Sequence, residues 1–331
     1  MSTPSMRALV LETTGGPFHS RQVPRPVAGP GQVLVRIAAS GVNPLDTKIR
    51  AGNAAHARHP LPAVLGMDLA GVVAEVGPGV DRFRPGDEVY GLTGGVGGLQ
   101  GSLAEYAAVD ADLLAIKPAA LSMREAAALP LVTITAWEGL VDRARTAAGD
   151  RVLVQGGSGG VGHVALQIAR VRGAQVFATV RPDQFDTVLG FGATPIDHTT
   201  TGVDDYVAQH TGGEGFDVVF DTVGGATLDA SFDAVRRHGG HVVSALGWGT
   251  HKLAPLSFRA ATYSGVFTLL PMLTGRCRAA HGRILQQAAA LADAGQLRPR
   301  VDACRFTLDT ALQAHQRVEE GRAQGKVVVE V

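Results

Sequence analysis

The sequence predicts an α/β protein of two domains, in which a doubly wound parallel sheet is inserted into a β-rich domain. Residues 151–245 alternate apolar strands with amphipathic helices, which is typical of a parallel sheet covered on both faces. The residues before about 127 instead form short strand patterns separated by glycine and proline. At the end of the chain, a helix from about residue 283 and a last strand at 326–331 are predicted. We assign them to the β-rich domain that the first part of the chain begins.

The elements expected from these patterns follow in chain order. Strands of the β-rich part are predicted at residues 7–12, 32–39, 70–76, 87–92 and 103–109. Residues 122–145 are helical in pattern, and Ser122 followed by Glu125 has the spacing of a capping box. The middle part is predicted to have strands at 151–155, 175–180, 194–197, 216–221 and 241–245, and helices at 161–172, 185–191, 203–211 and 226–235.

The bulk composition limits the class of protein. The chain has 331 residues, of which 45% are hydrophobic, and this is enough for two cores. Lys plus Arg and Asp plus Glu number 30 each, so no charge excess predicts a nucleic acid or an anionic membrane as partner. No apolar segment is long enough to span a bilayer. With two cysteines and no secretory signal pattern, we expect a cytoplasmic protein.

A glycine-rich segment after the first strand of the middle part indicates a bound dinucleotide. Gly157-Ser158-Gly159-Gly160-Val161-Gly162 has the G-x-G-x-x-G spacing, directly after an apolar strand and at the start of an amphipathic helix. We expect Gly157 to allow the tight turn, Gly159 to let the backbone approach a pyrophosphate, and Gly162 to let the helix pack on the strand. Backbone N–H groups at the helix start would face the anion. His163, just inside the helix, is expected at the surface rather than as a ligand of the phosphate.

The end of the second strand bears on the choice of nicotinamide cofactor. An NAD site places Asp or Glu there to bind the ribose 2′-hydroxyl. Here Arg181 follows the strand, and no carboxylate stands at its end. A guanidinium can pair with a 2′-phosphate, so Arg181 predicts NADPH. The alternative is that Arg181 is a solvated loop residue and that Asp183 binds the ribose.

Several further segments point to one protein family: GVNPLDTKIRAG (41–52), LGMDLAGVVAEVGPGV (65–80), GDEVYG (86–91), ALPLVTITAW (128–137) and GKVVVEV (325–331). With these and the glycine loop, the chain resembles the zinc-free quinone oxidoreductase branch of the medium-chain dehydrogenase/reductase superfamily. The resemblance implies a GroES-like substrate domain at residues 1–127 and 272–331 around a Rossmann domain at residues 128–271, with the active site between them. It also implies a homodimer through the edge strand of the Rossmann sheet, near residues 265–270.

The resemblance predicts that no metal is bound. Where the zinc enzymes of the superfamily carry their first cysteine ligand, this chain has Asn43, and where they carry a His-Glu pair it has Met67-Asp68. Their four-cysteine structural lobe is absent, since Cys277 and Cys304 lie far along the chain. Catalytic zinc takes Cys, His and carboxylate ligands with one open position, which these residues do not provide.

The resemblance also implies roles for individual residues. Asn43 matches an asparagine of the active site, and Thr135 matches a threonine at the nicotinamide end of the cofactor. Ser158 and the backbone of residues 159–161 match the pyrophosphate binders, and Arg181 and His198 lie where the family surrounds the ribose phosphate. Further cofactor contacts are expected at the ends of later strands, from Thr222, Val223, Leu246 and the backbone near Phe267.

Lys48 departs from the family pattern, because close relatives often have a tyrosine of the substrate cleft at this position. One interpretation is that Lys48 orients the substrate or donates a proton to it. The other is that Lys48 is a surface lysine whose stem packs on the protein.

Without a metal, hydride transfer must rely on positioning and on stabilising the negative charge that develops on the substrate oxygen. Asn43 and backbone N–H groups are expected to hold that oxygen. We therefore expect an NADPH-dependent reductase of quinones or other conjugated carbonyl compounds rather than of simple alcohols. Two alternatives stay open: an enoyl or alkenal reductase acting on a carbon–carbon double bond, and a non-catalytic scaffold protein that binds NADPH.

Overall fold

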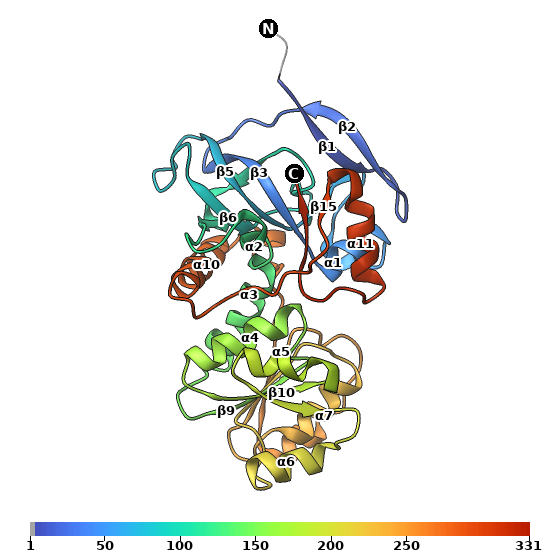
Figure 1. Ribbon diagram of the computed structural model, residues 1–331, viewed down its shortest axis with the longest axis vertical. Coiled ribbons are helices and arrows are strands. Elements are labelled where there is room, and N and C mark those ends of the chain that lie inside the picture. The colour runs from blue at the N-terminus through green and yellow to red at the C-terminus, as the bar shows by residue number, and fades with distance from the viewer. Residues whose placement is uncertain (1–3) are drawn as a thin grey trace. The chain divides into compact units, whose positions relative to one another are not determined.

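The computed structural model describes residues 4–331 and has the predicted α/β fold (Figure 1). The chain forms two compact units. The first unit consists of the residues up to Leu131 together with Leu269–Val331, and the second unit is Val132–Thr268. The segment that forms the parallel sheet is therefore inserted, in sequence, between two pieces of a β-rich unit.

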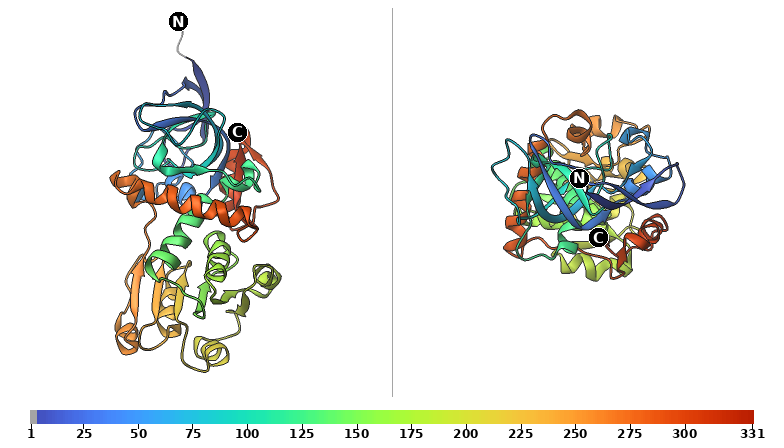
Figure 2. Two further views of the ribbon diagram at one scale, coloured as in Figure 1. Left: turned by 90° about the vertical axis from the view of Figure 1, so that its left-hand side faces the viewer. Right: turned by 90° about the horizontal axis from the view of Figure 1, so that it is seen from above.

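The first unit is built on a curled sheet of seven strands in the order β15-β16-β3-β5-β6-β8, with β7 paired to β3. Figure 2 shows these strands wrapping into a partly open barrel. The strands of this sheet are β3 (Gln32–Val42), β5 (Asp68–Val76), β6 (Glu88–Leu92), β7 (Tyr106–Asp110), β8 (Leu114–Ile116), β15 (Phe306–Thr307) and β16 (Val327–Glu330). A smaller sheet has the order β2-β1-β4, with β1 at Ser5–Leu11, β2 at Phe18–Pro24 and β4 at Ala63–Val64.

Helices cover the ends and edges of this barrel. They are α1 (Pro44–Arg50), α2 (Met123–Ala127), α9 (Leu270–Thr274), α10 (Arg278–Asp293) and α11 (Ala311–Glu319). In the sequence, α3 (Pro130–Trp137) contains the point, after Leu131, at which the first unit ends and the second begins. Short 3₁₀ helices lie at Ala55–Ala57, Ala111–Leu113 and Leu308–Thr310. Helix α10 packs on β8, and α11 packs on α1 and β16. Nowhere in residues 4–331 does a helix have the length and apolar character needed to cross a membrane.

The strand register of the first unit brings distant parts of the chain together. Strand β16 pairs antiparallel with β3, so that Val327 faces Val42. On its other side β3 pairs with β5, so that Gly41 faces Asp68. The end of β3, the start of β5 and the start of β16 therefore meet at one end of three adjacent strands.

The second unit contains the predicted parallel sheet, with six strands in the order β11-β10-β9-β12-β13-β14. Strands β9 (Arg151–Gln155), β10 (Gln175–Val180) and β11 (Thr194–Asp197) have the predicted bounds, and β12 (Val218–Asp221), β13 (His241–Ser244) and β14 (Thr262–Gly265) complete the sheet. Its helices are α4 (Gly160–Val171), α5 (Phe185–Gly190), α6 (Val203–Thr211), α7 (Ala226–Ala234) and α8 (Ala254–Arg259), with a 3₁₀ turn at Pro182–Gln184. Strand β12 (VVFD) is buried throughout, which is why the strands read as continuous apolar runs.

Two expectations about elements are wrong. Residues 122–145 do not form one helix, because α2 ends at Ala127, α3 begins at Pro130 and Glu138–Arg143 is a π-helix. Proline lacks an N–H and disfavours helical backbone in the residue before it, so Pro130 separates two helices. The capping box of Ser122 and Glu125 is confirmed. The edge strand is Thr262–Gly265 rather than residues 265–270, and Pro271 lies in the first turn of helix α9.

Candidate functional site

The glycine loop connects β9 to α4, and its glycines have distinct steric roles. The positive φ of the turn, +75°, falls at Gly156 rather than at the expected Gly157. A Cβ on Gly157 would lie 2.4 Å from the Cβ of Ala178 on β10, so Gly157 allows the loop to approach that strand. A Cβ on Gly162 would lie 2.1 Å from the carbonyl oxygen of Gly156, so the helix packs on the loop only with glycine there.

Gly159 is the residue of the loop that is open to a ligand. It is the N-cap of α4, it is exposed, and an added Cβ would meet only the Gly156 oxygen, at 3.3 Å. The loop is held from beneath by His163, whose Nδ1–H donates to the Gly159 carbonyl at 3.0 Å. The expectation that His163 lies at the surface is wrong, since its side chain is buried and packs beside Phe191. The first N–H groups of α4 are therefore presented on a rigid turn, where an anion is stabilised.

The strand order places this loop at the switch point of the sheet. Successive strands run outward in opposite directions from β9 and β12, which are neighbours, and ligands of doubly wound sheets bind beside such a point. Thr222, just after β12, donates its hydroxyl to the Gln155 carbonyl at the end of β9, 2.7 Å away. The buried Asp221 accepts the backbone N–H groups of Val223 and Gly224 at 3.1 and 2.9 Å. The side chain of Val223 is exposed at this edge of the sheet.

Arg181 and His198 lie beside each other beyond the ends of β10 and β11. The register pairs Val180 with Asp197, and both following residues, Arg181 and His198, are exposed. The guanidinium Nε of Arg181 is 3.3 Å from Oδ1 of Asp183. Hydrogen bonds from Gln184 and Arg181 lower the pKa of Asp183. The two residues that the sequence offered as alternatives for the ribose are thus paired with each other.

Three more of the predicted cofactor contacts lie along the same edge of the parallel sheet. Leu246 follows β13, where its N–H donates to the Ser244 hydroxyl at 3.0 Å. Phe267 follows β14, and its ring packs edge-on against Trp248. The hydroxyl of Thr135 is 2.9 Å from that of Thr268, the residue after Phe267. All the predicted cofactor residues of the second unit are therefore at the carboxyl ends of its strands or in contact with them.

In the first unit, Asn43 is the centre of a buried polar cluster. It is the N-cap of α1, its backbone N–H donates to Oδ2 of Asp46 at 2.8 Å, and its Nδ2 donates to Oδ2 of Asp68 at 2.9 Å. The ammonium of Lys326 donates to Oδ1 of Asn43 and, at 3.2 Å, to the carbonyl of Val42. The Lys326 ammonium is also 3.8 Å from Asp68.

Burial controls the charges of this cluster. It raises the pKa of Asp46 to about 7 and that of Asp68 to about 6, although Lys326 and hydrogen bonds from Asn43 oppose both shifts. Burial also lowers the pKa of Lys326, against the attraction of Asp68 and Asp46. Oδ1 of Asp46 has no hydrogen-bond partner within residues 4–331, which favours its protonated form. The cluster therefore keeps Asp68 paired with Lys326 and protonates Asp46 more readily.

The side chains at this point do not fit a zinc ion. Asn43 and Met67 offer an amide and a thioether, whereas zinc takes thiolate, imidazole and carboxylate ligands. The carboxylate of Asp68 is already paired with an ammonium, which would repel a second cation. Within the described chain, no group of three or more His, Cys, Asp or Glu side chains is placed to hold a metal ion.

Sequence reasoning singled out Lys48 and missed Lys326. Lys48 is exposed on α1 between the buried residues Thr47 and Ile49. Among the hydrogen bonds and ion pairs that hold the Asn43 cluster in residues 4–331, none comes from the Lys48 side chain. Lys326 is 4% exposed and lies just before β16. The signal available in the sequence was the rarity of lysine, which occurs only four times, beside the strongly apolar strand VVV.

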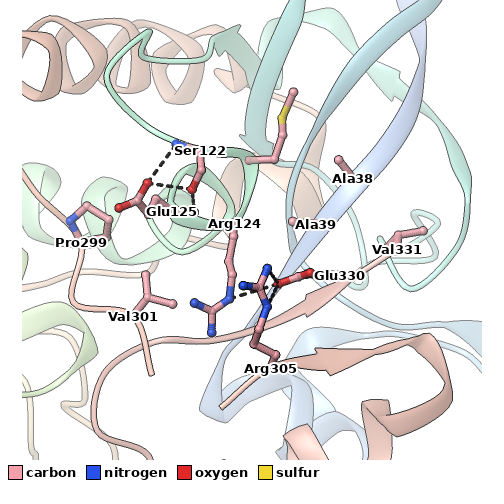
Figure 3. A pocket seen from close by; sticks show the side chains of 11 residues that line it. Ala38, Ala39, Ser122, Arg124, Glu125, Pro299, Val301, Arg305, Glu330 and Val331 are labelled. Atoms are coloured by element: carbon pink, nitrogen blue, oxygen red, sulfur yellow. Dashed lines mark hydrogen bonds and ion pairs between the residues drawn. The ribbon is translucent and has the colours of Figure 1, made fainter. Parts of the chain in front are cut away.

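Two pockets of the first unit contain none of the predicted site residues. One, of about 790 Å³, lies between α2 and the last strand, where Arg124 and Arg305 both point toward Glu330 (Figure 3). Their distances to the Glu330 carboxylate are 3.4 and 2.8 Å, so its charges are paired internally. The other, of about 480 Å³, is lined by Ile49 of α1 and by residues that follow it, including His59.

Family models and known proteins match this chain over most of its length. Two family models match, the alcohol dehydrogenase GroES-like domain over residues 29–119 and the zinc-binding dehydrogenase over residues 189–329. The chain is 36% identical over 306 residues to the chloroplastic NADPH-dependent alkenal/one oxidoreductase of Arabidopsis thaliana, covering 90% of this chain and 72% of that protein.

Solved structures are similar over almost the whole chain. An alcohol dehydrogenase superfamily protein from Novosphingobium aromaticivorans matches with a TM-score of 0.97 and 59% identity, over 98% of this chain and 99% of that one. The quinone oxidoreductase from Coxiella burnetii matches with a TM-score of 0.83 and 27% identity, over 99% of this chain and all of that one. The fold of both units is thus shared with oxidoreductases of one superfamily.

The steric roles of the glycines predict different effects of two alanine substitutions. Gly162→Ala drives a Cβ into backbone and is expected to cost about 1–3 kcal/mol of unfolding free energy, measured with urea. Gly159→Ala is expected to fold with nearly wild-type stability but to bind NADPH more weakly, measured by fluorescence titration. Wild-type stability of Gly162→Ala would contradict the packing role.

The raised pKa of Asp46 predicts a pH-dependent cost of folding. The protonated carboxyl stabilises the folded state fully below the unfolded pKa of 3.8, and this contribution is lost as the pH rises through about 7. Asp46→Asn cannot ionise and keeps an acceptor for the Asn43 N–H. Its stability relative to the wild type is therefore expected to rise between about pH 4 and about pH 8, measured by urea unfolding.

The matched control is Asp81→Asn, which changes an exposed carboxyl of the same unit. Its stability relative to the wild type should not change with pH over this range. A flat difference for Asp46→Asn as well would show that the buried carboxyl does not hold a proton.

Proposed function

Since the chain belongs to the medium-chain dehydrogenase/reductase superfamily and is an oxidoreductase with a nicotinamide cofactor, we propose that it is an NADPH-dependent reductase of conjugated carbonyl compounds. The observation that carries the proposal is the row of predicted cofactor residues at the carboxyl edge of the parallel sheet. The glycine loop (157–162) follows β9, Arg181 follows β10 and His198 follows β11, and these three strands are neighbours in the sheet. A dinucleotide is a ligand whose length and charges suit such a row.

Each end of the cofactor has its own partners in this proposal. The N–H groups at the start of α4 bind the pyrophosphate, and the exposed Gly159 lets it approach the backbone. Arg181 and His198 bind the 2′-phosphate, and Arg181 exchanges its contact with Asp183 for the phosphate. Thr135 and the backbone near Phe267 hold the nicotinamide, which supplies the hydride when the cofactor is bound.

Asn43 binds the substrate oxygen in this proposal. Its Nδ2 carries two hydrogens, and the described residues give an acceptor to one of them, Oδ2 of Asp68. The second hydrogen donates to the oxygen that becomes negative as the hydride arrives, and solvent supplies the proton. A neutral amide suits an oxygen whose charge is spread over a conjugated system, because such an oxygen needs less stabilisation than an alkoxide.

Enones and quinones are the two substrate classes to compare. The Arabidopsis relative is named for alkenals and alkenones, and the Coxiella structure is named a quinone oxidoreductase. In an enone the hydride is added to the β-carbon, and in a quinone it is added to the ring system. Both reactions leave negative charge on a carbonyl oxygen, so Asn43 has the same task in each.

We further propose a homodimer through the edge strand β14. Its N–H groups at Thr262 and Val266 bond to β13, so by the alternation of a strand those of Tyr263 and Gly265 face outward. An exposed edge with unpaired N–H groups pairs readily with a second copy.

The proposed activity predicts which compounds consume NADPH. Enones and quinones are expected to be reduced, and simple saturated alcohols are expected not to be oxidised with NADP⁺. The measurement is absorbance of NADPH against a panel of the three classes, with Lys48→Ala and Asn43→Ala beside the wild type. Asn43→Ala is expected to lose about 10²- to 10³-fold in kcat.

Two outcomes of this panel would oppose the proposal. Cofactor binding without turnover of any compound would favour the scaffold interpretation. Alcohol oxidation that matches enone reduction would refute the role given to conjugation. Wild-type rates for Lys48→Ala would assign Lys48 to the surface.

The role of Arg181 predicts a change in cofactor preference. Arg181→Ala is expected to lower the ratio of kcat/KM for NADPH to that for NADH roughly tenfold or more, because a charged hydrogen bond to the 2′-phosphate is lost. Arg237→Ala, which removes another exposed arginine of the second unit, serves as the control and should keep the ratio. An unchanged ratio in Arg181→Ala would refute this role and favour the alternative, in which Asp183 binds the ribose.

A further inference from the structure

Lys326 is a charged side chain in a buried position, where loss of hydration makes a charge unfavourable. It is 4% exposed, and its ammonium contacts the carbonyl of Val42, Oδ1 of Asn43 and the carboxylate of Asp68. A buried ammonium is kept only where its partners compensate for the lost water. Its closest side-chain partner is the amide of Asn43, the residue to which the proposed function gives the substrate oxygen.

We propose that Lys326 is a positioning residue, whose ammonium fixes and polarises the Asn43 amide so that one amide N–H is held ready for the substrate oxygen. The inference rests on the proposed function for the identity of that oxygen. Lys326 thereby supplies, from the chain itself, a fixed positive charge behind the group that binds the substrate.

The two ends of the amide are distinguished by opposite charges. The Lys326 ammonium only donates hydrogen bonds, and the ionised Asp68 carboxylate only accepts them. With Oδ1 toward Lys326 and Nδ2 toward Asp68, both contacts are favourable. Rotating the amide by half a turn would place donor against donor and acceptor against acceptor. The pair of charges therefore selects one of two orientations that have the same shape.

The same contacts change the strength of the remaining N–H. A cation at the amide oxygen withdraws electron density from the nitrogen, and chains of hydrogen bonds polarise one another in this way. The second Nδ2 hydrogen becomes a better donor to a developing oxyanion. A pre-oriented donor also needs no rearrangement as the charge develops, which is the basis of oxyanion stabilisation.

The chain contains a matched control for this lysine. Lys117 is also buried in the first unit, at 8% exposed, and its ammonium also contacts a backbone carbonyl, that of Pro118 at 2.9 Å, and a carboxylate, that of Glu88 at 3.1 Å. The hydrogen bonds and the ion pair of its ammonium go to Pro118, Leu121 and Glu88, and none of them involves Asn43. Lys117→Met therefore removes a comparable buried charge without touching the proposed contact.

The first test needs no turnover. The chain has two asparagines, the buried Asn43 and the exposed Asn53, so ¹⁵N-asparagine labelling gives two side-chain amide signals with an internal reference. In the wild type the Asn43 amide protons should exchange slowly with solvent and those of Asn53 rapidly. Lys326→Met should shift the Asn43 signal and speed its exchange, and Lys117→Met should leave both unchanged. An Asn43 signal unaffected by Lys326→Met would overturn the proposal.

The second test separates positioning from charge balance. Lys326→Met is expected to lower kcat for an enone by about tenfold to a hundredfold, with little change in KM for NADPH, and Lys117→Met is expected to keep the wild-type kcat. Asp68→Asn with Lys326→Met removes both charges and serves if the single variant does not fold. The double variant should fold but keep the low kcat, and recovery of wild-type kcat would overturn the proposal.

Failure of the proposed function is recognised separately. A wild type that reduces no conjugated carbonyl compound would refute the activity. The labelled amide signals would still decide whether Lys326 orients Asn43.

Discussion

The contact between the Lys326 ammonium and the Asn43 amide joins residues 283 positions apart, and the polar interior of the first unit depends on it. A charge at this depth must be paired, and the pairing requires β16 to lie beside β3 with its start at the end of that strand. Asp68 comes from β5, on the other side of β3, and completes the pair. Three adjacent strands are therefore held in register by one charged group as well as by their ladders.

The same cluster explains the start of α1. This helix has seven residues, too few for stability from its own hydrogen bonds. Its first turn is fixed because Asp46 accepts the backbone N–H of Asn43, while the Asn43 side chain is occupied by Asp68 and Lys326. The N-cap therefore serves both the helix and the cluster, so that the geometry of the amide is tied to the backbone.

The accuracy of the predictions follows the range of the interactions that form each element. The parallel strands β9, β10 and β11 were predicted with the observed bounds because their apolar runs are local signals that burial on both faces requires. The two-residue strands β4 and β15 carry no such signal and exist only through their partners. The helix predicted over residues 122–145 was interrupted at Pro130, where a local rule outweighed the helical pattern.

The sequence by itself determined the two-domain α/β class, the glycine-rich loop between a strand and a helix, the residues at the strand ends and the family, because these depend on periodicity and on motifs of fixed spacing. It also determined that Asn43, Met67 and Asp68 offer a donor set unlike that of a zinc site. Only the tertiary structure decided that His163 supports the loop from inside and that Lys326 faces Asn43. Such partners are selected by strand register and burial. Neither can be predicted from local sequence patterns when the residues lie hundreds of positions apart.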